Sequence, residues 1–99
     1  MAKFPAEDIH LESAERLVRE HRALAHIRVR KRSDTIVLES GPKNDPVPHA
    51  RLRRVTAQWW TVEMPTRAGR WEPTPIRAPL QEAISSLVTD YPWVLTPIR

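Results

Sequence analysis

The chain has 99 residues, of which 40% are hydrophobic, and its 16 lysines and arginines outnumber its 12 aspartates and glutamates to give a net charge of +4. This length suits a single domain, 1–99, and the absence of cysteine excludes disulfides, thiol nucleophiles and cysteine-ligated metals. No apolar run approaches the length of a membrane span and the first residues have no signal-peptide pattern, so we expect a cytoplasmic protein with no membrane partner.

Helical spacing of apolar residues occurs near both ends of the chain. From about Asp8 to Leu24, alanine, leucine and valine side chains recur at the interval of a helical turn, which predicts a helix with one buried face. Near the C-terminus, Pro79 suits a first helical position and Pro92 suits a helix end, and an apolar stripe lies between them. We therefore expect an N-terminal and a C-terminal helix.

The segments between these helices alternate apolar and polar side chains, which is the pattern of half-buried strands. Strands are expected at residues 26–32, 35–40, 49–55, 58–64 and 70–72. Pro73 is expected to stop the last of them, which leaves it a short edge strand. The alternation places Trp60 in the core and turns Trp59 and His49 to the opposite face.

Together these elements predict one two-layer α+β domain of order α-β-β-β-β-(β)-α. Its antiparallel sheet has four to five strands, with one apolar face and one polar face. Both helices are expected to pack on the apolar face, because each has only one stripe to bury. The polar face is then left to solvent or to a partner.

The outward face of the predicted sheet gathers cations around one aromatic ring. The candidate nucleic-acid-binding residues are Arg28, Arg30, Arg32, Arg51, Arg53 and Trp59. In several binders of single-stranded nucleic acid, bases stack on an aromatic ring while guanidinium groups bind phosphates. An acidic protein would suit the same surface. A third interpretation is a solvated face, in which the arginines pair with Glu39 and Glu63 and their stems cover Trp59.

A second candidate surface is apolar. Its residues are Trp71, near the edge strand, and Trp93, Val94 and Leu95, which follow the last helix. One interpretation is a protein-interaction surface, for a homodimer or another partner. The other is that the C-terminal residues cap the core.

The side chains that usually carry chemistry have no catalytic or metal-binding spacing. The four histidines lack the close spacing of a metal motif, no serine lies in a nucleophile context, and there is no glycine-rich phosphate loop. Glu63 and Glu72 flank a predicted hairpin, where ion pairs with Arg67 or Arg70 are favoured over an acid–base pair. We therefore predict a non-enzymatic binding module without cofactor or metal. Nucleic-acid binding is the leading hypothesis, and a protein-interaction adaptor or dimeric structural protein is the alternative.

One set of residues carries a resemblance to a known family. It consists of Pro46-Val47, Ala50, Trp60-x-Val62, Trp71-Glu72-Pro73-x-Pro75 and a closing helix. With these residues, the half of the chain from Pro46 to about Trp93 resembles a small uncharacterised bacterial domain family. The shared residues are packing residues, so the resemblance implies a bacterial protein but no activity, cofactor or site residue.

Overall fold

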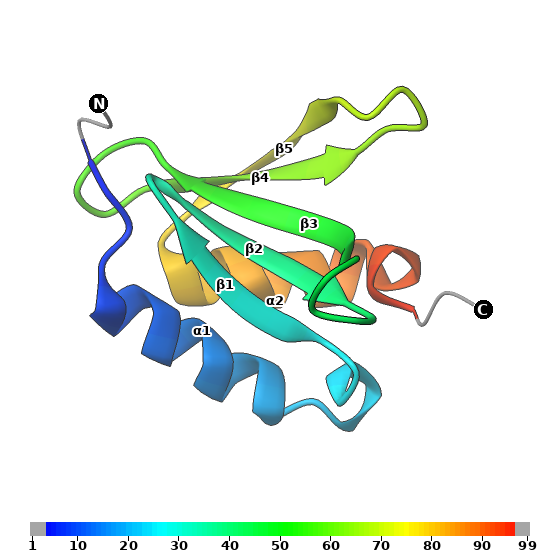
Figure 1. Ribbon diagram of the computed structural model, residues 1–99. Helices are drawn as coiled ribbons and strands as arrows, with labels where there is room; N and C mark the ends of the chain where they lie inside the picture. The colour runs from blue at the N-terminus through cyan, green and yellow to red at the C-terminus, as the bar shows by residue number, and fades with distance from the viewer. Residues whose placement is uncertain (1–3, 97–99) are drawn as a thin grey trace.

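The computed structural model describes residues 4–96, which form a helix, a five-stranded antiparallel sheet and a second helix (Figure 1). The elements in chain order are α1 (Asp8–Arg19), η1 (Arg22–Leu24), β1 (Arg28–Arg32), β2 (Thr35–Ser40), β3 (Val47–Arg54), β4 (Trp60–Pro65), β5 (Trp71–Ala78), α2 (Leu80–Asp90) and η2 (Pro92–Leu95). The strands neighbour one another in chain order, and both helices lie on the same side of the sheet. The predicted two-layer α+β fold is confirmed.

The core lies between the helices and one face of the sheet. Helix α1 packs against β1 and β2, and α2 packs against β4 and β5. Trp60 is 2% exposed, whereas its neighbour Trp59 is 43% exposed. The large side chains that are fully buried are Trp60, Ile36, Leu38, Leu52, Ile84, Leu87, Leu95 and Val62. The predicted alternation of Trp59 and Trp60 is therefore correct, and no helix within residues 4–96 lies on the other face of the sheet.

The N-terminal helix is shorter than predicted. It ends at Arg19, and the chain reaches Leu24 through the short turn η1. Leu24 follows Val18 by six positions, so a continuous helix would place the two side chains about 120° apart around its axis. The break lets both side chains enter the core.

None of the helices within residues 4–96 combines the length and apolar character needed to cross a bilayer.

Strand β5 is longer than predicted, because it continues through Pro73 and Pro75. It is an edge strand, so its prolines can lack an N–H where no neighbouring strand requires one. Its pairing with β4 is irregular at this point. The Thr74 hydroxyl donates to the Val62 carbonyl at 2.9 Å and so replaces a ladder bond. Pro73 therefore does not end the sheet.

His49 is buried, in contrast to the outward position predicted for it. Leu38 lies opposite Ala50 and Glu39 lies opposite Pro48, which leaves His49 as the extra residue of a β-bulge. A bulge shifts the alternation of side chains by one residue. His49 consequently lies on the core side with an exposure of 2%.

Two histidines hold the C-terminal turn η2 against the sheet. His49 Nδ1 lies 2.9 Å from the Val94 carbonyl and must donate to it, so Nε2 accepts the Ser40 hydroxyl at 2.7 Å. His26 Nε2 donates to the Leu95 carbonyl at 2.7 Å. The two imidazole rings meet edge to face with centroids 5.8 Å apart. The hydrogen bonds from these two histidines to η2 fix Leu95 in the core.

His10 closes the first turn of α1. Its Nδ1 accepts the backbone N–H of Glu7 at 3.0 Å, one half of a capping box. Its ring also meets Trp60 edge-on, with centroids 5.1 Å apart. Burial lowers the pKa of His10 below its ordinary value of 6.5, the positive charge of Arg54 lowers it further, and Glu7 opposes the shift. The fold therefore favours the neutral ring.

This arrangement predicts a pH-dependent stability. The unfolded chain takes up a proton on His10 more readily than the folded chain, so the free energy of unfolding should fall as the pH drops below about 6.5. The loss should level off once the pH is below the pKa of the folded state. A His10→Gln variant keeps a capping-box side chain but does not titrate, so its urea midpoint should vary less over this range. Identical pH profiles for both proteins would contradict the role of His10.

Candidate nucleic-acid interface

The helix-free face of the sheet carries its side chains in rows that run across the strands. The register from β1 to β5 places one row at Arg32, Thr35, Arg53, Thr61 and Arg77. The next row is Arg30, Val37, Arg51, Glu63 and Pro73. Adjacent strands are about 4.8 Å apart, so arginines two strands apart in a row stand about 10 Å apart at their backbones. Arg28, opposite Glu39, extends the same surface. The five predicted arginines thus share one face.

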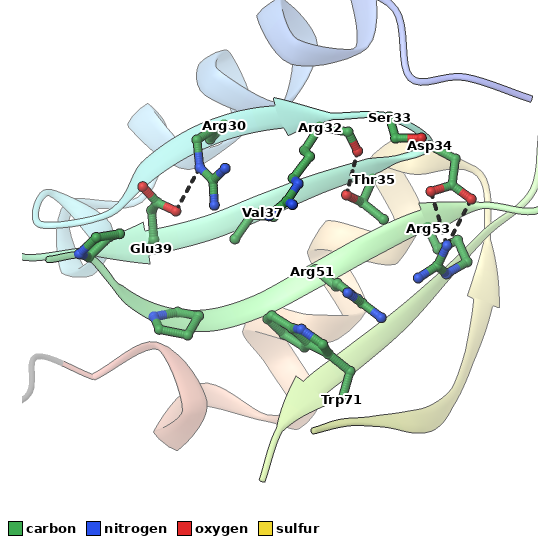
Figure 2. A pocket seen from close by; sticks show the side chains of 12 residues that line it. Arg30, Arg32, Ser33, Asp34, Thr35, Val37, Glu39, Arg51, Arg53 and Trp71 are labelled. Carbon is green, nitrogen blue, oxygen red and sulfur yellow. Dashed lines mark hydrogen bonds and ion pairs between the residues drawn. The ribbon is translucent and has the colours of Figure 1, made fainter. Parts of the chain in front are cut away.

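This face is hollowed rather than flat. A cavity of about 480 Å³ lies over β2, between side chains of β1 and β3 (Figure 2). Thr35 and Val37 line it, although they are only 6% and 5% exposed. The long arginine side chains that lie opposite them on β1 and β3 cover them. The arginines in its lining are Arg30, Arg32, Arg51 and Arg53, and the other large groups are Pro46, Pro48 and Trp71. We call this cavity the arginine hollow.

At one end of the arginine hollow, Glu39 holds two arginines. Arg30 Nε donates to its carboxylate at 3.0 Å, and an Arg28 terminal nitrogen lies 3.8 Å away. Arg28 also donates to the carbonyl of Gly41. The Glu39 side chain is only 8% exposed, whereas that of Arg30 is 46% exposed. The guanidinium of Arg30 therefore lies nearer to solvent than the carboxylate that orients it.

At the other end, two carboxylates hold the arginines of β3. Glu63 accepts from Arg51 Nε at 2.6 Å and lies 3.4 Å from Arg53 Nε. Asp34 accepts two bonds from one terminal nitrogen of Arg53, at 3.0 and 2.8 Å. The ion pairs expected for a solvated face are thus present. Three carboxylates nevertheless face the five predicted arginines and Arg77, so positive charge remains in excess on this surface.

Arg32 differs from the other four arginines. Its backbone carbonyl accepts the Thr35 hydroxyl at 2.7 Å, but within residues 4–96 its guanidinium has no ion pair and no hydrogen bond. Figure 2 shows this side chain extending from β1 over β2. Arg32 is exposed. It can therefore bind an anion without releasing a partner.

The aromatic ring beside these arginines is Trp71, and not Trp59 as predicted. The guanidinium carbon of Arg51 lies 4.5 Å from the centre of the Trp71 ring, within the range of a cation–π contact. Trp59 precedes β4, where its backbone N–H donates to the Thr56 hydroxyl, and it does not line the hollow. Trp71 was predicted to belong to the apolar surface instead, but its place opposite Pro65 in the hairpin of β4 and β5 puts it on the arginine face.

The residues predicted to form an apolar interaction surface do not lie together. Trp71 belongs to the arginine hollow, whereas Leu95 is 2% exposed and is a core residue that no partner can reach. Val94 is half-buried against the core. Trp93 is 63% exposed and contacts Tyr91, with ring centroids 5.5 Å apart. Trp93 is thus the one member of this set that stands free at the surface.

Histidines and carboxylates of the described chain do not converge on a metal: residues 4–96 contain no group of three such side chains placed to hold an ion. Comparison of the chain with protein-family models, curated proteins and solved structures found no match. The resemblance to a bacterial domain family therefore stays a prediction. The fold and the site define a small α+β domain with a charged, open sheet face.

Proposed function

We propose that the protein is a non-enzymatic binding module that binds single-stranded nucleic acid on the helix-free face of its sheet. The observation that carries this proposal is the arginine hollow, in which four guanidinium groups from β1 and β3 surround a cavity beside Trp71. Guanidinium groups bind phosphates bidentately and stack on bases, so this pairing suits both parts of a nucleotide. A cytoplasmic location belongs to the same proposal.

The shape of the surface favours a single strand over a duplex. The aromatic ring and the guanidinium groups border a recess, and a base must leave its stack to enter it. Bases of a duplex are held inside the helix, whereas those of a single strand can be splayed onto such a surface. The buried position of Glu39 also matters, because an approaching phosphate meets the exposed guanidinium of Arg30 first.

The proposal predicts a salt-dependent affinity. A labelled single-stranded oligonucleotide should bind more tightly than a duplex at about 50 mM salt, and its affinity should fall steeply by about 200 mM as counterions are released. Arg32→Gln should weaken binding and reduce the magnitude of the logarithmic salt slope by about 1, since one phosphate contact is lost. Fluorescence anisotropy titrations at several salt concentrations measure both quantities.

The matched control is Arg16→Gln, which removes the same charge from an exposed position on α1, in the helix layer. Binding should be nearly unchanged in this variant, because α1 lies on the opposite side of the sheet from the hollow. Equal weakening by Arg16→Gln and Arg32→Gln would mean that only net charge attracts the oligonucleotide. No binding at low salt would reject nucleic acid as the partner.

One observation favours a second candidate function, a protein-interaction adaptor or a homodimer. The indole of Trp93 is exposed beside Tyr91, on a turn that His26 and His49 hold rigidly. Exposed aromatic groups on rigid supports are common in protein interfaces. A dimer in sedimentation experiments that Trp93→Ser dissociates, together with no oligonucleotide binding, would support this candidate instead.

A further inference from the structure

Two contacts hold the Arg51 side chain in place. Its Nε donates to Glu63 at 2.6 Å, and its guanidinium carbon lies 4.5 Å from the centre of the Trp71 ring. Glu63 itself is only 16% exposed, so this carboxylate is a firm anchor. The Arg51 side chain is 21% exposed and lines the arginine hollow. Two neighbours thus fix the guanidinium, and its remaining surface borders the cavity.

We propose that Arg51 is the base-stacking platform of this surface, and that a base of the bound strand stacks on its guanidinium as the outer layer over Trp71. This inference rests on the proposed function and assigns the base contact within it. A guanidinium is planar and has two faces, and a ring on one face leaves the other to a ligand. Bases stack on guanidinium planes as they do on aromatic rings.

The other arginines of the hollow suit phosphates instead. Arg53 is turned between Glu63 and Asp34, and no aromatic ring within residues 4–96 is stacked on it. Arg30 and Arg32 are more exposed, and the guanidinium of Arg32 has no partner within the described chain. Exposed guanidinium groups that are not stacked on a ring bind phosphate oxygens, whatever the base sequence of the strand. The strand therefore places a base over Arg51 and its phosphates toward Arg53 and the arginines of β1.

The test compares two labelled oligomers of equal length and charge, a short oligothymidylate and the same sugar-phosphate backbone without bases. The wild-type protein should bind the oligothymidylate about tenfold more tightly at low salt, because only this oligomer can stack. Arg51→Lys keeps the charge but loses the plane, so it should reduce the preference to about twofold or less while binding of the abasic oligomer stays nearly constant. Anisotropy titrations give both affinities.

The matched control is Arg53→Lys, the same substitution two residues along the same strand and face, which should retain the preference. Trp71→Leu provides a second test, since it keeps the pair of Arg51 with Glu63 but removes the supporting ring, and it too should lower the preference. Thermal melts confirm that each variant is folded.

Equal wild-type binding of both oligomers would overturn the stacking platform and leave the nucleic-acid proposal standing, whereas binding of neither oligomer would overturn both. Loss of the preference in Arg53→Lys as well as in Arg51→Lys would overturn the assignment of the base to Arg51.

Discussion

Trp60→Ala is expected to lower the free energy of unfolding by about 3–5 kcal/mol, as truncation of large buried aromatic residues usually does. The indole is 2% exposed, and the edge-on contact with His10 joins β4 to the start of α1. A domain of this size has a total stability of about 5–15 kcal/mol, so the loss would be a large part of it. Urea denaturation followed by far-UV circular dichroism measures the change.

The neighbouring residue supplies the control. Trp59→Ala removes an identical side chain from a position that is 43% exposed and should change the free energy of unfolding by about 0.5 kcal/mol or less. The contrast tests which face of the sheet is covered by the helices. If Trp59→Ala were the more damaging change, the helices would cover the face assigned to the arginines, and the proposed interface would be lost.

The fold could be predicted because its determinants are local. Alternation of side chains over a few residues is enough to identify a strand, and the predicted segment 35–40 coincides with β2. The same alternation separated Trp59 from Trp60 and put the five arginines on one face. Each strand pairs with the next one in the chain, so the sheet needs no long crossover connection. The sheet then has one apolar face, and the two amphipathic helices cover it.

The errors occurred where a contact distant in sequence overrides the local pattern. A single extra residue breaks the alternation of side chains where it is inserted, and His49 is such a residue. Its ring donates a hydrogen bond to the carbonyl of Val94, 45 positions later in the chain. Likewise, β5 continues past Pro73 because the edge of a sheet tolerates missing N–H groups. The edge position of the last strand was predicted, but neither the bulge nor the continuation past Pro73 is visible in the local pattern.

The candidate site was predicted in part for the same reason. The arginines belong to regular strands, so their common face followed from alternation alone. Pairing with Glu39 and Glu63 was one interpretation of that face, but which arginine meets which carboxylate depends on the register, as for Arg51 and Glu63 between β3 and β4. The ring of Trp71 reaches the site through the pairing of β5 with β4, in which Trp71 lies opposite Pro65. Consequently the charge of the surface was predicted, but its hollow and its aromatic residue were not.

The bulge at His49 leads to the second large expected effect, a loss of about 2–4 kcal/mol in the free energy of unfolding on substitution by leucine. Leucine fills a similar volume, but it leaves the Ser40 hydroxyl and the Val94 carbonyl without their partner in the interior, at about 1–3 kcal/mol for each group. His26→Leu should cost less, because His26 is half-buried and makes one such bond.

Two measurements distinguish a His49 that is buried at a β-bulge from a His49 that faces outward on a regular strand. Chemical denaturation gives the global loss, and amide hydrogen exchange should accelerate over residues 92–96 in His49→Leu, since η2 is no longer held to β3. A surface histidine would behave differently, because its substitution usually changes stability by about 0.5 kcal/mol or less and would leave exchange in η2 unaltered. A result of that kind would place His49 on the arginine face after all, and the bulge would have to be abandoned.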